Sequence, residues 1–197
     1  MNILLDTLPE YITIDGKDYF IDTDFRTCII FEKLLNGDSD DRESVETWLD
    51  LFYTVERPSD VQAAVDGILF IYCCGNPDKP KEPTRKNGNV VLKPKMLYDF
   101  EIDAPYIFGA FMSQYGIDLN EIEYLHWWKF QSLFRSLNSS NKIVEIMSYR
   151  ATDISQIKSK SEQARIARLQ KLYEIPHAMT REEKIAHAGA AFGGGLF

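Results

Sequence analysis

Three pairs of a glutamate and a histidine have the spacing best suited to chemistry in this sequence. They are Glu123-x-x-His126, Glu174-x-x-His177, and the pair Glu183 and His187 four residues apart. On a helix such pairs can hold iron, but a di-iron site also needs two further inward carboxylates and unbroken helices. Pro176 interrupts the second pair, and the third lies in a C-terminal stretch of low apolar content. We therefore expect no metal and no other cofactor, and retain a metal-dependent enzyme only as an alternative.

The sequence lacks the patterns of a catalytic nucleophile, a phosphate-binding loop and a zinc site. His126 could act as a general base, but no Ser or Cys with the turn signature of a nucleophile stands near it in sequence. The glycines at 193–195 have no leading strand and no following Lys-Ser/Thr, as a phosphate-binding loop requires. The adjacent Cys73 and Cys74 lack the spacing of a zinc site. We expect a protein that is not an enzyme.

The charge of the chain is negative and unevenly distributed. The 197 residues have a net charge of −8; residues 1–75 hold 16 acids and 5 bases, and residues 99–125 hold 6 acids and no base. Phosphates require Lys and Arg, so we expect no nucleic-acid partner and no anionic membrane surface as a partner. The longest apolar run, 61–74, is shorter than the about 20 residues that span a bilayer.

The N-terminus and the cysteines indicate where the protein works. The first residues lack the basic region and long apolar stretch of a signal peptide. Three cysteines do not make a disulfide framework, and Cys73 and Cys74 lie in an apolar run where small buried side chains are expected. A reducing cytoplasm fits this pattern best.

The first half of the chain predicts a hairpin followed by three helices. Tyr11–Ile14 and Asp18–Ile21 flank Asp15-Gly16, which favours a positive-φ turn. The expected helix starts are Asp24, Ser44 and Pro58, with Asn36-Gly37 and Gly75 as signals that end the first and third helices.

Residues 76–97 contain four prolines and six bases and have no helical period. We interpret them as an exposed connection between two helical halves, 1–75 and 98–176. The segment has no interleaved aromatic residue to stack bases, so docking on the acidic first half or on an acidic partner is an alternative use.

Four helices are expected in the second half, and a mobile tail at 177–197. Asp103 and Pro105 begin a helix to Tyr115, which Gly116 ends, and a second runs from Asp118 or Asn120 to about Leu137. The last two are Lys142–Tyr149 and about Ser159–Glu174. The fold class is therefore mainly α: one multi-helix domain over 1–176, with a small N-terminal β-hairpin and a Pro/Lys-rich connection between its halves.

Aromatic side chains recur at helical spacing through residues 98–137, where no catalytic pattern interrupts them. Large aromatic residues supply much of the binding energy in protein interfaces. The candidates for partner binding are Tyr124, Trp127, Trp128, Phe130 and Phe134. Such rings also build cores, so packing is the competing interpretation for each of them.

Six ordered segments resemble the bacteriophage "gene product fifteen" family of phages and prophages of Gram-positive bacteria. They are Tyr98-Asp-Phe-Glu, Asp103-Ala-Pro-Tyr-Ile, Tyr115-Gly-Ile-Asp-Leu, Tyr124-Leu-His-Trp-Trp-Lys-Phe, Ile146-Met-Ser-Tyr-Arg and Lys171-Leu-Tyr-Glu-Ile-Pro. The opening hairpin followed by Asp24-Phe-Arg also fits, so the resemblance covers roughly residues 3–176. The tail after Pro176 does not match the pattern.

The resemblance implies a gene beside the tape-measure gene, where tail assembly chaperones are usual. Such a chaperone coats the tape-measure protein in the host cytoplasm and is absent from the finished virion. The implied partner is the tape-measure protein, with the tail tube protein and self-association left open. A structural protein that stays in the tail is the alternative. The family has no catalytic residue to carry over.

Overall fold

The computed structural model describes residues 2–35, 41–76 and 96–175. Most of the predicted connection at 76–97, the Asn36-Gly37 signal and the predicted tail at 177–197 lie outside these residues. The described residues form two compact units. The N-terminal unit contains 2–35, 41–76 and 123–132, and the C-terminal unit contains 96–122 and 133–175. The short segment 123–132 thus packs with the first half of the chain.

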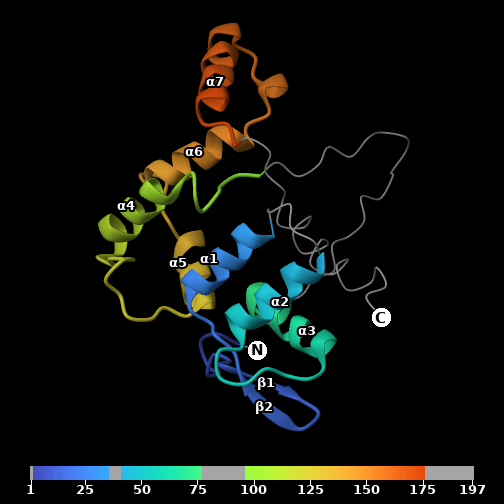
Figure 1. The fold of residues 1–197 in the computed structure, drawn as a ribbon. Coiled ribbons are helices and arrows are strands. Elements are labelled where there is room, and N and C mark those ends of the chain that lie inside the picture. The colour runs from blue at the N-terminus through green and yellow to red at the C-terminus, as the bar shows by residue number, and fades with distance from the viewer. Residues whose placement is uncertain (1, 36–40, 77–95, 176–197) are drawn as a thin grey trace. The chain divides into compact units, whose positions relative to one another are not determined.

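The N-terminal unit begins with the predicted hairpin, whose strands are β1 (Tyr11–Ile14) and β2 (Lys17–Phe20) (Figure 1). The strands are antiparallel, with Tyr11 opposite Phe20 and Ile14 opposite Lys17. Asp15 and Gly16 have φ of 51° and 78°, the left-handed values that a two-residue turn requires. The turn prediction is confirmed.

Three helices follow the hairpin: α1 (Phe25–Leu34), α2 (Asp41–Phe52) and α3 (Val61–Tyr72). The Asp24 carboxylate accepts the Arg26 backbone N–H, which confirms the predicted cap of α1. The predicted start of α2 at Ser44 was wrong by three residues. Residues 41–43 include no proline or glycine, so the backbone can continue this helix back to Asp41.

The predicted start of α3 at Pro58 was also wrong by three residues. Asp60 is the N-cap, because its carboxylate accepts the Ala63 backbone N–H at 3.0 Å, an acceptor that proline cannot supply. Gly75 follows the helix with φ 73°, as the ending signal predicts.

An aromatic cluster fills the core of the N-terminal unit. The ring of Phe31 makes edge-on contacts with Trp48, Phe52 and Tyr72 at centroid distances of 5.3–5.4 Å. The Tyr72 hydroxyl donates to the buried Glu32 carboxylate at 2.9 Å. Cys28 and Cys73 are buried beside this core, as expected for small apolar side chains, whereas Cys74 is half-buried. Burial raises the pKa of the Cys28 thiol well above its ordinary value.

The C-terminal unit contains α4 (Ala104–Tyr115), α6 (Lys142–Ala151), the short 3-10 helix η1 (Ile154–Gln156) and α7 (Lys160–Leu172). In this unit α4 packs on α6, and α6 packs on α7. Gly116 ends α4 with φ 66°, as predicted. Helix α7 begins one residue after the predicted start at about Ser159, and the Ser159 hydroxyl accepts the Glu162 N–H as its cap.

A buried ion pair joins the elements of the C-terminal unit. The guanidinium of Arg150 contacts both carboxylate oxygens of Asp103 at 2.5 and 3.0 Å, and it also donates to the carbonyls of Leu97 and Tyr173. Asp103 stands at the N-cap position of α4 as predicted, but its side chain makes no cap bond. Its carboxylate binds Arg150 and the Asp99 N–H instead.

Helix α5 (Trp127–Arg135) corrects the sequence prediction most clearly. It begins at Trp127, well after the predicted start at Asp118 or Asn120. The Asp118 carboxylate accepts the backbone N–H groups of Asn120 and Glu121, which makes a turn. The chain before α5 then forms an isolated antiparallel bridge between Asp24 and His126, in which the Phe25 N–H donates to the Leu125 carbonyl and the Trp127 N–H donates to the Thr23 carbonyl.

The described residues are therefore mainly α with one small hairpin, as the sequence predicts. Within them, every helix is too short or too polar to cross a lipid bilayer.

Candidate partner-binding surfaces

Four of the five rings predicted to bind a partner are buried. Trp127 and Phe130 have no exposed surface, Trp128 is 4% exposed and Phe134 is 5% exposed. Phe134 packs against Tyr98 and Phe100 in the C-terminal unit. The structure does not test whether these rings bind a partner, so that role stays a prediction. In this conformation they serve packing.

The two tryptophans complete the end of α3. The Trp127 indole N–H donates to the Tyr72 carbonyl at 2.9 Å, and the Trp128 indole N–H donates to the Ile71 carbonyl at 2.7 Å. Carbonyls in the last turn of a helix have no partner within that helix. A Cβ at Gly75 would lie 2.8 Å from the Trp128 ring, so this position requires glycine for space as well as for its φ.

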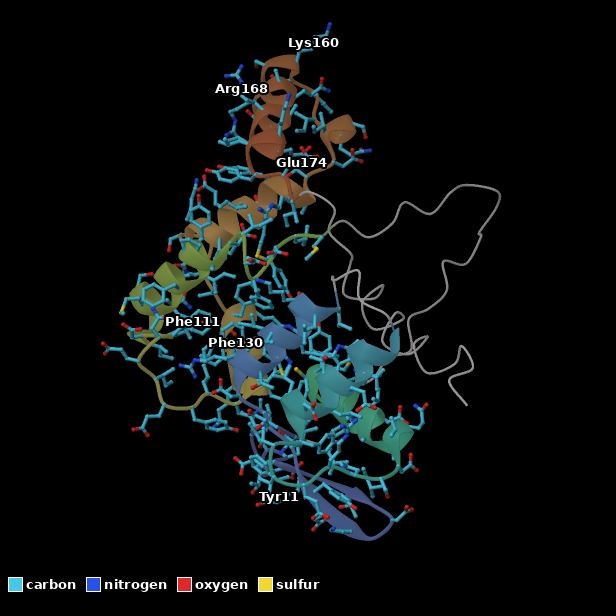
Figure 2. The ribbon with its side chains drawn as sticks, in the orientation of Figure 1. Tyr11, Phe111, Phe130, Lys160, Arg168 and Glu174 are labelled. Atoms are coloured by element: carbon cyan, nitrogen blue, oxygen red, sulfur yellow. The ribbon has the colours of Figure 1, made fainter. Side chains whose placement is uncertain are left out.

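Four nearly parallel rings continue this packing. Tyr72 stacks on Trp127, Trp127 on Phe130, and Phe130 on Phe25, each pair with an interplanar angle of 11°. Phe130 is labelled on α5 in Figure 2. The stack joins the ends of three segments that are distant in sequence, so its rings hold the N-terminal unit together.

His126 is a structural residue in this fold. It is buried, its Nδ1 accepts the Trp128 backbone N–H at 3.0 Å, and its Nε2 donates to the Pro9 carbonyl at 3.1 Å. Burial lowers the pKa of its imidazole, which favours the neutral ring that these two bonds require. His126 precedes α5, so it and Glu123 do not share the face of a helix. The described residues hold no group of three His, Cys, Asp or Glu side chains placed to bind a metal.

Tyr124 is the one predicted ring that remains exposed, at 45%. Its hydroxyl forms a 2.7 Å hydrogen bond with the Thr23 hydroxyl and lies 3.5 Å from the Glu10 carboxylate. Partial burial raises the pKa of this phenol. These bonds fix the ring at the surface of the N-terminal unit, beside the exposed acids Glu10 and Glu123.

A larger apolar surface lies on α4 of the C-terminal unit. We call it the α4 face and define it as Ile102, Pro105, Tyr106, Gly109 and Met112, all exposed. Ile102 precedes the helix and is 46% exposed; Tyr106 and Met112 are 37% and 40% exposed. Positions 105, 106, 109 and 112 share one side of an α-helix, while Ile107, Ala110 and Phe111 are buried on the other. Figure 2 labels Phe111 on this helix.

The α4 face suits close contact with another helix. The twelve residues of α4 include no charged side chain, so a partner would bury no charge of this helix. A Cβ at Gly109 would meet nothing within 4 Å, which leaves the backbone open to approach. The ring of Tyr106 packs edge-on against Tyr173 at 6.4 Å and is thereby oriented before a partner arrives.

Sequence reasoning missed this surface because it followed the density of rings. The available signal was the absence of charge: a mostly apolar helix with no Asp, Glu, Lys or Arg is typical of a helix that is covered over most of its surface. In the described residues α4 buries only one side.

Comparison with known proteins adds a family. A family model described as "Bacteriophage Gp15 protein" matches residues 4–175, which cover nearly all the described residues of both units. Comparison with curated proteins and with solved structures gave no match.

Proposed function

The chain belongs to the bacteriophage Gp15 protein family, and we propose that it is a tail assembly chaperone that binds the tape-measure protein. Family membership supports a structural or assembly role in a phage. The finer proposal is that the protein binds in the host cytoplasm, supports growth of the tail tube in a siphovirus or prophage, and leaves before the virion is complete. It acts by binding and performs no reaction.

The observation that carries this proposal is the α4 face. A tape-measure protein is long and largely helical, and its apolar stripe is adhesive before the tube encloses it. Recognition of a helix requires apolar anchors with the spacing of a helix surface. Tyr106 and Met112 flank the open backbone at Gly109 and supply one rigid and one adaptable anchor.

The predicted rings have a secondary place in this proposal. Tyr124 is accessible and could add a contact on the N-terminal unit. A partner could reach the rings of Trp127, Trp128 and Phe130 only if they separated from the end of α3. Both indoles donate hydrogen bonds to that end, and Phe130 stacks on Trp127. We therefore assign the first contact to the α4 face.

Co-expression with the tape-measure protein of the same phage tests the proposal. We expect a soluble complex that is captured through a tag on this chain. The double variant Tyr106→Ala/Met112→Ala should lower capture by about tenfold or more, because hot-spot side chains contribute about 2 kcal/mol. Its free energy of unfolding should fall by less than about 1 kcal/mol, since both side chains are partly exposed.

Leu172→Ala is the matched control, because Leu172 is 69% exposed on α7 of the same unit. It should leave capture unchanged. A tape-measure protein that is equally soluble alone, or that never co-purifies, contradicts the proposed chaperone. Abundant peptides of this chain in purified virions would indicate a structural tail component instead. Light scattering of the free protein measures self-association, and co-expression with the tail tube protein tests that further partner.

A further inference from the structure

A hollow lies beside the hairpin of the N-terminal unit. Its volume is about 280 Å³, and it is lined by Tyr11, Asp18, Tyr19, Phe20, Val55 and Glu56. The rings of Tyr11 and Phe20 meet edge-on across the two strands at 5.8 Å. Tyr11 is 58% exposed and Val55 is 78% exposed, so the hollow has apolar walls open to solvent. Tyr11 is labelled on the hairpin in Figure 2.

The outer edge of β2 can accept another strand. The two-residue turn makes Ile14–Lys17 and Ile12–Tyr19 the hydrogen-bonded pairs of the hairpin. The backbone N–H and C=O groups of Asp18 and Phe20 therefore point away from β1. Within the part of the chain that the structure describes, no hydrogen bond joins these groups to a neighbour. Such an edge pairs readily with an extended segment.

The polar groups of the hollow favour a cation. Asp18 and Glu56 bring two carboxylates to its wall, next to three aromatic rings. The chain itself already places one cation against these groups. The Lys17 ammonium pairs with Glu56 and lies 4.8 Å from the centre of the Tyr19 ring. Carboxylates and ring faces both attract an ammonium or guanidinium group. The acidic excess of residues 1–75 adds a longer-range attraction.

We propose that this edge binds an extended segment of a partner polypeptide that carries an Arg or Lys between apolar residues. The segment adds a third strand to β2 through Asp18 and Phe20. Its basic side chain enters the hollow against Asp18 and Glu56, and the apolar residues two positions away, whose side chains lie on the same face of the sheet, contact Phe20 and Val55. Anionic partners such as nucleic acids and acidic lipids are disfavoured by the same carboxylates. This inference does not rest on the proposed function, which uses a face of the other unit.

Fluorescence anisotropy with labelled peptides and the full chain tests the inference. The probe is the synthetic peptide Val-Thr-Arg-Thr-Val-Thr, which places valines on the same face as Arg, and its partner is the same peptide with Glu in place of Arg. We expect the Arg peptide to bind at least about tenfold more tightly at low salt, with the difference shrinking as salt rises. Methylation of alternate backbone nitrogens in the Arg peptide should abolish binding, because a third strand needs those N–H groups.

Paired variants locate the site. Asp18→Asn and Glu56→Gln should each lower the affinity for the Arg peptide by about threefold or more. Asp66→Asn on α3 and Glu121→Gln are the matched controls, since both acids are exposed and lie outside the hollow. Circular dichroism verifies that each variant is folded.

Three results would overturn the inference: equal affinity for the Arg and Glu peptides, equal loss in the control variants, or no binding of either peptide at millimolar concentration. A fourth would reassign the occupant. In that case the Arg peptide would bind only to a variant in which the six bases of residues 79–95 are replaced by Gln. That result would show that this segment of the same chain occupies the site, and the proposal of an external partner would be wrong.

Discussion

The tryptophans of the N-terminal unit and the helix α4 of the C-terminal unit use their apolar side chains in opposite ways. The N-terminal unit contains all three tryptophans, and each is at least 96% buried. The C-terminal unit leaves Tyr106 and Met112 exposed on a helix that carries no charge. The dense group of rings where α3 meets α5 is therefore sealed, whereas the uncharged helix α4 offers an open surface.

The units also differ in what holds them together. In the N-terminal unit, stacked rings and two indole N–H groups join α3 to α5. In the C-terminal unit, one buried guanidinium joins α4, α6 and the chain after α7. Loss of a charge partner in a buried pair costs more than loss of one neutral hydrogen bond. Substitutions in the two units should thus lower the free energy of unfolding by different amounts. They should also differ in whether circular dichroism or tryptophan fluorescence reports the loss.

Arg150→Ala should have the largest effect. It leaves the buried Asp103 carboxylate without its partner, which typically costs about 3–5 kcal/mol of unfolding free energy. Because every tryptophan lies in the N-terminal unit, circular dichroism should report a larger loss than tryptophan fluorescence in urea unfolding. Arg165→Ala is the control, since its pair with Glu162 is exposed. Equal shifts in both signals would show that the units unfold together and would weaken the comparison.

Trp127→Phe should have an intermediate effect. Phenylalanine keeps an aromatic ring in the stack but removes the N–H that binds the Tyr72 carbonyl, at a cost of about 1–3 kcal/mol. Fluorescence and circular dichroism should both detect this loss. Phe70→Leu, which removes an edge-on ring contact with Trp128 but no indole hydrogen bond, serves as the comparison. If the variant is as stable as the original protein, the indole hydrogen bond does not stabilise the contact between α3 and α5.

His126 should give the smallest effect, visible as a dependence on pH. Because burial lowers its pKa below the ordinary value of 6.5, the unfolded chain binds a proton more readily than the folded chain. Stability is therefore full above about pH 6.5 and falls as the pH drops through that value towards the folded pKa. Glu10 opposes the shift and Lys129 adds to it.

His126→Asn tests this assignment, because the Asn amide oxygen can replace Nδ1 as the acceptor for the Trp128 N–H and does not titrate. The free energy of unfolding, measured in urea between pH 5 and 8, should depend less on pH in this variant. An unchanged pH profile would assign the dependence to other groups.

Local signals in the sequence predicted most elements of the fold. Asp15-Gly16 predicted the hairpin turn, Asp24 predicted a helix start, and Gly116 predicted a helix end. Each of these features depends on a few neighbouring residues and on the φ that one residue can adopt. The family resemblance likewise depended on ordered segments and was confirmed over residues 4–175.

The sequence by itself thus determined the helical class, the turns and caps, and the family. Only the tertiary structure decided where α5 begins and which rings are accessible. Residues before Trp127 pair with Thr23 and Phe25, and the two indoles find their acceptors at the end of α3. Those partners lie more than fifty residues away in sequence. A hydrogen bond or a buried contact between such distant segments leaves no periodic trace in either one, because the pattern of each segment records only its own period.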